Sequence, residues 1–90
     1  MTDVRNNTAE SRFELDVEGH IAVAYYDFSP GVITFTHTEV PDALAGRGVG
    51  SKLAKGALDA VRAQKLKVVA RCPFIAAYIG KHPEYQDLLK

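Results

Sequence analysis

Three alternating glycines are the most distinctive chemical feature of the sequence. Gly46, Gly48 and Gly50 come just before a stretch with helical spacing, and Arg47 and Lys52 add positive charge beside them. The first N–H groups of a helix have no intrahelical partner and carry partial positive charge. Glycines let a phosphate approach those donors without meeting a Cβ atom. The segment therefore predicts a pyrophosphate site, although a glycine-rich turn capping an ordinary helix explains the same residues.

Two common phosphate-binding motifs do not fit this segment. A nucleoside-triphosphatase loop, G-x-x-x-x-G-K-[ST], needs Lys directly after the glycine, whereas Gly50 is followed by Ser51 and only then by Lys52. A dinucleotide fingerprint begun at Gly46 would place its third glycine at Ser51, and residues 65–70 contain no acidic side chain for the ribose. Both motifs are excluded.

The glycines and a second block resemble a known family. Val40-Pro41 and Gly48-Val49-Gly50, together with CPFIAAYIGKHPEY at residues 72–85, resemble the GNAT superfamily of CoA-dependent N-acetyltransferases. The resemblance covers nearly the whole chain and is strongest to the small stand-alone members of the family. The family pattern [RQ]-x-x-G-x-[GA] is broken at its first position, where Ala45 stands in place of Arg or Gln. Arg47 is a candidate to replace the missing side chain.

The resemblance implies acetyl-CoA as cosubstrate and no metal ion. The acetyl group would pass directly, in a ternary complex, to an amine acceptor: a small amine, a polyamine or a lysine of a peptide or protein. Two parallel strands would splay apart around the pantetheine arm, Val40 would offer it main-chain bonds, and residues 46–51 would hold the pyrophosphate. The residues implied in coenzyme binding are Val40, Ala45, Gly46, Arg47, Gly48, Val49, Gly50, Ser51 and Lys52.

Acetyl transfer to an amine needs a base, a stabilised oxyanion and a proton for the departing thiolate. His37 is the candidate base, because imidazole commonly exchanges protons near neutral pH; the alternative is a strand histidine packed beside Phe35. Cys72 precedes a predicted helix, and a helix N-terminus favours the thiolate form of a cysteine. Three roles stay open for it: a covalent nucleophile, a side chain that lines the acetyl pocket, or a buried residue that only packs in the core. Tyr78 is the candidate proton donor to the thiolate, or an aromatic side chain packed on the sheet.

The elements that must position these residues follow from hydrophobic periodicity. Alternation predicts strands at 12–17, 20–28 and 32–40, joined by short turns into an antiparallel meander. In the third strand, Ile33, Phe35, His37 and Glu39 are expected on one face, and Thr34, Thr36 and Thr38 on the other. Helical spacing predicts a helix at 48–64. A strand at 67–71, a helix at 73–80 and a helical turn at 84–89 complete the order.

Strand, helix and strand across residues 32–71 are long enough for a right-handed parallel crossover. The fold class is therefore α+β, a minimal GNAT-like fold: an antiparallel meander, a parallel strand-helix-strand crossover and a C-terminal helix. Ninety residues make one domain, 1–90, of which the polar residues 1–11 are expected to be flexible.

Composition and charge narrow the class of protein. The chain has 11 basic and 11 acidic residues, so its net charge is zero, which argues against a nucleic-acid binder. Residues 1–44 hold two basic and eight acidic side chains, whereas residues 45–90 hold nine and three. The positive half suits an anionic ligand, and Glu14, Asp16 and Glu18 of the acidic half are candidates to attract a cationic acceptor.

A single cysteine, no apolar run of membrane-spanning length and no apolar leader segment favour a cytoplasmic protein without membrane contact. Nothing in the sequence demands a dimer, so a monomer is expected. Two functions other than catalysis stay open as alternatives. One is a CoA- or acyl-CoA-binding module without catalysis, and the other is an interaction domain that kept the fold and lost the ligand.

Overall fold

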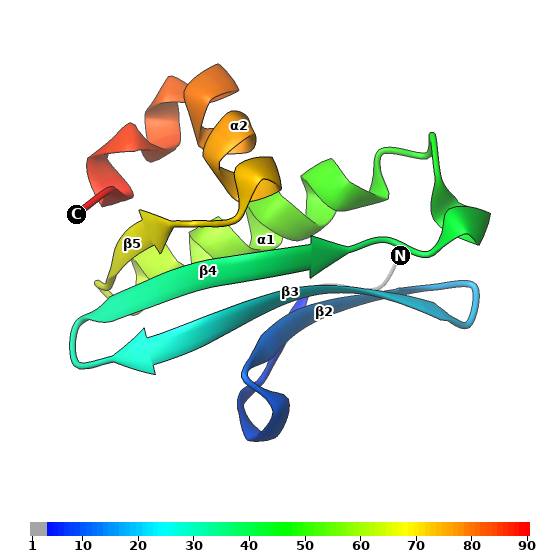
Figure 1. Cartoon of the computed structure of the whole chain (residues 1–90), viewed down its shortest axis with the longest axis horizontal. Helices are drawn as coiled ribbons and strands as arrows, with labels where there is room; N and C mark the ends of the chain where they lie inside the picture. Colours follow the sequence, from blue (N-terminus) through cyan, green and yellow to red (C-terminus); the bar gives the residue numbers. More distant parts are fainter. Residues whose placement is uncertain (1–3) are drawn as a thin grey trace.

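The computed structural model describes residues 4–90, which form a mixed sheet with its helices packed at one face and one end (Figure 1). The strand order is β1-β2-β3-β4-β5. The strands are β1 (Arg5–Asn7), β2 (Arg12–Val17), β3 (His20–Ser29), β4 (Val32–Glu39) and β5 (Lys67–Ala70). The helices are α1 (Val49–Ala63) and α2 (Pro73–Lys81), with 3-10 helices η1 (Thr8–Glu10), η2 (Asp42–Leu44) and η3 (Pro83–Leu88).

The predicted topology is confirmed. Strands β2, β3 and β4 are antiparallel neighbours, and β4 and β5 are parallel and joined through α1. Short turns such as Ser29-Pro30-Gly31 allow the antiparallel pairs, whereas the parallel pair needs the length of a helical crossover. The α+β class, with a meander, a crossover and a C-terminal helix, is therefore the observed architecture.

Strand β1 was not predicted from the sequence. It pairs with β2 from Arg5↔Glu14 to Asn7↔Arg12, and Arg5 and Asn7 both donate hydrogen bonds to the Glu14 carboxylate, at 2.9 and 3.0 Å. Side-chain bonds thus hold a segment of low β-propensity in the sheet. Of the stretch 1–11 expected to be flexible, residues 1–3 lie outside the described residues, and 5–10 belong to β1 and η1.

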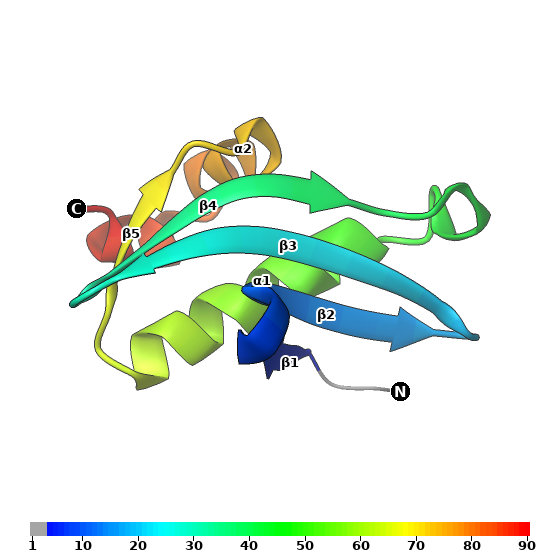
Figure 2. The same ribbon diagram turned by 60° about the horizontal axis from the view of Figure 1, so that its bottom comes forward.

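The core lies between the sheet and α1 (Figure 2). Helix α1 crosses one face of the strands, and its buried residues recur at helical spacing, as amphipathic packing requires. They are Val49, Leu53, Ala54, Ala57, Leu58 and Val61. They meet Phe13, Leu15, Tyr26 and Phe35 of the strands in one cluster. Helices α2 and η3 cover the β5 end and are tied to α1 by a 2.7 Å hydrogen bond from Tyr85 Oη to Asp59.

A β-bulge in β4 overturns one expectation. Tyr25 pairs with His37 and Tyr26 with Phe35, so Thr36 is an extra residue. Because a bulge shifts the alternation by one residue, His37 lies on the Tyr25 face of the sheet, opposite Phe35. Phe35 is fully buried, whereas 63% of the His37 side chain is exposed. The prediction that Phe35 and His37 share a face is therefore wrong, and Thr38 joins the core-facing side instead.

Strands β4 and β5 part after their fourth residue pair. Their pairing ends at Phe35↔Ala70, where the carbonyl of Phe35 accepts hydrogen bonds from both Arg71 N, at 3.0 Å, and Cys72 N, at 2.9 Å. Beyond this point β4 continues to Glu39, while the chain after β5 turns into α2. The backbones of two neighbouring parallel strands thus diverge next to the start of α1 and the start of α2 (Figure 1).

Candidate functional site

The glycine segment forms an open cradle at the N-terminus of α1. Gly46 and Gly48 have φ values of +77° and +71°, a conformation that non-glycine residues rarely adopt. Gly48 is the N-cap of α1, and no side chain caps the helix there. The N–H groups of the first turn therefore have no side-chain acceptor at the cap, which leaves them available to an anion.

A cavity of about 290 Å³ lies at this cradle. Among its lining residues are seven of the nine implied in coenzyme binding: Val40, Ala45, Gly46, Gly48, Val49, Gly50 and Ser51. Leu44, which is 1% exposed, and Phe74 complete the lining. The buried Leu44 side chain anchors the loop between β4 and α1, so a short connection holds the cradle in place.

Arg47 and Lys52 are not part of that lining. The Arg47 guanidinium binds the Glu18 carboxylate at the β2–β3 turn through two hydrogen bonds, of 2.8 and 3.3 Å. This bond and the Arg47 charge lower the pKa of Glu18. The structure thus directs the Arg47 side chain to the hairpin, and the cradle consists mainly of backbone and small side chains.

Phe74 of α2 closes one side of the cradle. A Cβ atom placed on Gly50 would lie 2.8 Å from Phe74 Cζ, so a larger residue there would require the ring to shift from its place on the first turn of α1. Phe74 and Ser51 also line a second cavity, of about 210 Å³, with Ala77, Tyr78, Lys81 and His82. Two adjoining cavities therefore run from the β4–α1 loop along α2. Phe74 could not be singled out from the sequence beyond its place in the block 72–85.

Tyr78 lines the second cavity. Its side chain is 9% exposed, and its ring stacks on that of His82 with the centroids 4.0 Å apart. Burial raises the pKa of the Tyr78 hydroxyl above its ordinary value. The phenol thus carries its proton at neutral pH, which a proton donor to a strongly basic thiolate requires.

Cys72 lies at the N-cap of α2, where β4 and β5 have parted. It is 2% exposed, and its Sγ lies 3.2 Å from Thr38 Oγ1, where either atom can be the donor. Thr38 reaches this position because of the bulge at Thr36. The Thr38 contact was not foreseen from the sequence, since strict alternation hides a bulge.

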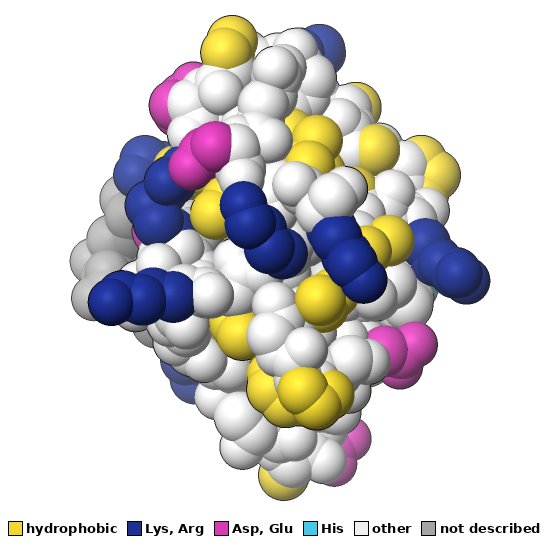
Figure 3. All heavy atoms as spheres, turned by 90° about the vertical axis from the view of Figure 1, so that its left-hand side faces the viewer, with side chains coloured by type: hydrophobic (Ala, Val, Ile, Leu, Met, Phe, Trp, Pro, Cys, Tyr) yellow, Lys and Arg dark blue, Asp and Glu magenta, His cyan; other side chains and the backbone are white. Residues whose placement is uncertain are grey.

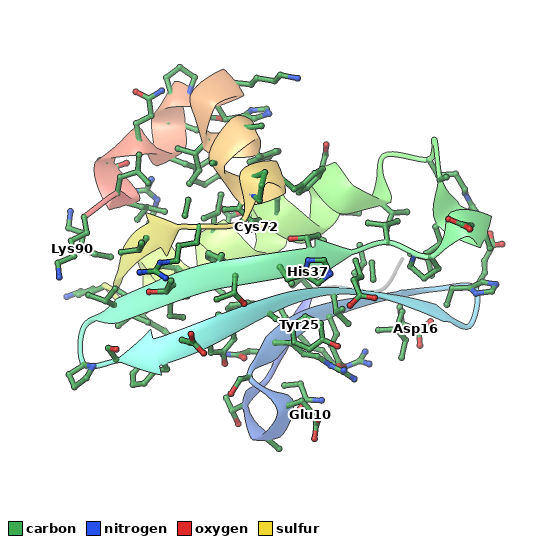
Figure 4. The ribbon with its side chains drawn as sticks, viewed as in Figure 1. Glu10, Asp16, Tyr25, His37, Cys72 and Lys90 are labelled. Atoms are coloured by element: carbon green, nitrogen blue, oxygen red, sulfur yellow. The ribbon has the colours of Figure 1, made fainter. Side chains whose placement is uncertain are left out.

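His37 lies on the other face of β4 (Figure 4). Its ring stacks on Tyr25, with centroids 6.4 Å apart, and its Nε2 lies 3.3 Å from Glu39 Oε2. The structure therefore brings Cys72 and Tyr78 to the α2 side of the strand opening, and His37 to the helix-free face. A metal role finds no support among residues 4–90, where no group of three or more His, Cys, Asp or Glu is placed to hold an ion.

Comparison with known proteins agrees with this geometry. Residues 12–88 match the family model of the GCN5-related N-acetyltransferases. The chain is 41% identical over 68 residues to protein NATD1 of Gallus gallus and of Homo sapiens, which covers 74% of this chain and 62% and 60% of those proteins. The chain thus spans less than two thirds of the length of these relatives.

A solved structure is similar over nearly the whole chain. The NMR solution structure of a GCN5-like protein from Staphylococcus aureus superposes with a TM-score of 0.74 and 33% sequence identity. The match covers 99% of this chain and 88% of that one. Among residues 4–90, no helix is long and apolar enough to cross a membrane. The chain belongs to the GCN5-related N-acetyltransferase (GNAT) family.

Proposed function

We propose that the chain binds acetyl-CoA and transfers the acetyl group directly to a primary amine. The observation that supports this most is the glycine cradle: an uncapped helix N-terminus with Gly46 and Gly48 at positive φ, beside the point where β4 and β5 part. Such a terminus binds phosphate through backbone N–H groups. Family membership supplies the expectation that this phosphate belongs to coenzyme A.

The residues that would hold the coenzyme follow from the two adjoining cavities. The N–H groups of Val49, Gly50 and Ser51 face the pyrophosphate, and the main chain at Val40 offers bonds to the pantetheine arm. Phe74 and Tyr78 line the continuation of the groove along α2. Ala45 contributes no charged side chain, so binding depends mostly on backbone donors.

Three side chains divide the chemistry in this proposal. His37 takes the proton from the amine, and the Glu39 carboxylate, 3.3 Å from its Nε2, stabilises the imidazolium that forms. The amine nitrogen attacks the acetyl carbonyl carbon, the C–S bond breaks, and the thiolate takes the proton of the Tyr78 hydroxyl. Cys72 lines the thioester end of the groove through its contact with Thr38 and forms no bond to the acetyl group.

A panel of amines tests this reaction. Thiol release from acetyl-CoA is followed with small amines, polyamines and lysine-containing peptides. Amine-stimulated release with formation of the N-acetyl product is expected. Retained CoA binding without release by any amine would contradict catalysis.

That contrary result would favour the second candidate, a CoA-binding module without catalysis. One observation supports this alternative: the family Arg or Gln is replaced by Ala45, and Arg47 is bound to Glu18 rather than lining the cradle. The two candidates share the coenzyme site and differ only in turnover.

A further inference from the structure

The face of the sheet opposite α1 carries a second kind of site. Among residues 4–90, neither α1 nor α2 crosses this face of β2, β3 and β4 (Figures 1 and 2). The strand register places Arg12, Tyr25 and His37 in one row and Glu14, Val23 and Glu39 in the next. Side chains in such rows are near neighbours, because paired residues lie only about 5 Å apart. The bulge at Thr36 brings His37 and Glu39 of β4 to this face.

A cavity of about 280 Å³ occupies these rows. Its lining is Arg12, Ile21, Val23, Tyr25, Glu39, Val40 and Pro41. Val23 is 7% exposed although no helix covers it, so its neighbours wall it in and it forms an apolar floor. Ile21 is 39% exposed and extends the apolar surface. A hollow of this volume is large enough for a ligand of few atoms.

The charges around the cavity differ at its two ends. At one end the Arg12 guanidinium bonds to Glu14, donates to Tyr25 Oη at 3.2 Å and lies 5.7 Å from the Tyr25 ring centroid. Glu14 is 3% exposed and also receives Arg5, so these charges are mutually compensated. At the other end, 60% of the Glu39 side chain is exposed, and its neighbour at 3.3 Å is His37, which is charged only when protonated. This end therefore favours a cation.

The cavity also adjoins the coenzyme cradle. Val40 lines both the 280 Å³ cavity and the 290 Å³ cavity at Gly46 and Gly48. The two hollows thus meet at the end of β4, one on each side of the sheet. A molecule seated on the helix-free face would come close to the parted strands without crossing the coenzyme groove.

We propose that this cavity is the acceptor site and that it takes an unbranched aliphatic primary amine of the lysine side-chain type. The methylene stem lies on Val23 and Ile21, and the ammonium group lies at Glu39 beside His37. The ammonium loses one proton to His37, and the free amine forms a bond to the acetyl carbon as the C–S bond breaks. The departing thiolate takes the proton of Tyr78, and the second proton that the nitrogen loses restores the Tyr78 hydroxyl. The proposal rests on the proposed acetyltransferase function and adds the acceptor class and its face of entry.

Binding of a probe amine tests the site without turnover. Amide shifts of the whole chain are recorded with CoA present and n-butylamine added. Saturable shifts at Ile21, Val23 and Glu39 are expected. If CoA shifts residues 45–51 but butylamine leaves residues 21–25 and 39 unchanged, the acceptor site is wrong while the coenzyme site stands. If CoA itself does not bind, the proposed function fails first.

Turnover tests the chemistry of recognition. Along the series ethylamine, propylamine and butylamine, KM for the amine should fall about two- to fourfold per methylene, as burial of CH₂ on an apolar floor predicts. The variant Ile21→Ala should flatten this dependence, and Glu39→Gln should raise the amine KM at least fivefold while leaving KM for acetyl-CoA unchanged. A KM independent of chain length, or an unaltered KM in Glu39→Gln, would overturn the proposal.

The matched control is Asp27→Asn. Asp27 is an acidic residue of β3 on the same face of the sheet as Glu39, two residues beyond Tyr25 and outside the cavity. The amine KM of Asp27→Asn should equal that of the unchanged protein. An equal rise of the amine KM in Asp27→Asn and Glu39→Gln would show a general charge effect instead. A lysine-containing peptide and a free diamine present the same primary amine. Comparing turnover with the two then shows whether the acceptor amine belongs to a protein or to a small molecule.

Discussion

At the scale of single residues, Gly48 and Gly31 form a natural pair for testing the cradle. Both have φ above +70°, and a Cβ at either would meet no atom within 4 Å. Gly48→Ala and Gly31→Ala should therefore cost similar stability, about 1 kcal/mol each, from backbone strain. Only Gly48→Ala should weaken CoA binding, because Gly31 lies in the β3–β4 turn. Calorimetric titration with CoA measures this, and equal loss of affinity in both variants would contradict the assignment.

His37 and Cys72 lie on opposite faces of β4, which separates their roles. His37→Gln should lower kcat by about 10²-fold, as loss of a general base does, with KM for acetyl-CoA unchanged. Cys72→Ser keeps a polar atom near Thr38 and should retain most of the activity. Steady-state kinetics of the two variants check this. A Cys72→Ser protein without turnover but with intact fold and CoA binding would instead indicate a covalent acetyl-cysteine step.

At the scale of elements, hydrophobic periodicity predicted most of the helices and strands. Strict alternation at residues 12–17 and the helical spacing after Gly48 each correspond to an element with nearly the predicted bounds. The bulge at Thr36 escaped prediction because Val32–Glu39 alternates without a break in the sequence, and only pairing with β3 shows the extra residue. β1 escaped because Arg5 and Asn7 depend on a tertiary partner, Glu14, rather than on strand propensity.

The docking of η3 on α1 gives a pH-dependent prediction. Burial, and then the hydrogen bond to Asp59, raise the pKa of Tyr85 to about 12. A phenol whose pKa is raised on folding stabilises the protein fully below its unfolded pKa of about 10. That contribution is lost as pH rises from about 10 to 12.

The variant Tyr85→Phe isolates this effect. It should unfold more easily at pH 7, by about 1 kcal/mol for the missing hydrogen bond. It should also lose less further stability between pH 10 and 12 than the unchanged protein. Urea denaturation at both ends of this range measures the difference, and parallel pH curves for the two proteins would rule out Tyr85 as the titrating group.

At the scale of the whole molecule, the net charge of zero is the sum of an acidic half and a basic half of the sequence. The acidic first half and basic second half meet in pairs such as Glu18–Arg47, while Lys and Arg side chains gather on the face at the β5 end (Figure 3). Of the three acids expected to attract an acceptor, Glu14 and Glu18 are bound by arginines, whereas Asp16 accepts a hydrogen bond from Gly19 N and pairs with Ile21 across β2 and β3. Glu39 takes that place in our proposal, which shifts the expected attraction from the N-terminal acids to the end of β4.

The candidate site was predictable only in part. The cradle residues could be named from the sequence because three alternating glycines stand at a predicted helix start and the resemblance to the GNAT family points to the same segment. The positions of His37, Cys72 and Tyr78 relative to one another could not, since they depend on the bulge and on where α2 begins. The acceptor cavity combines β2, β3 and the loop after β4, residues that no local motif connects.

The central claim is that the α1 cradle binds coenzyme A, and one titration tests it most directly. Amide shifts are followed as CoA is added to the full chain. We expect saturable shifts confined to Val40, residues 45–51 and Phe74, with the β3–β4 turn at Gly31 unchanged. No shift in residues 40–51 at millimolar CoA would contradict the coenzyme site and every function proposed from it.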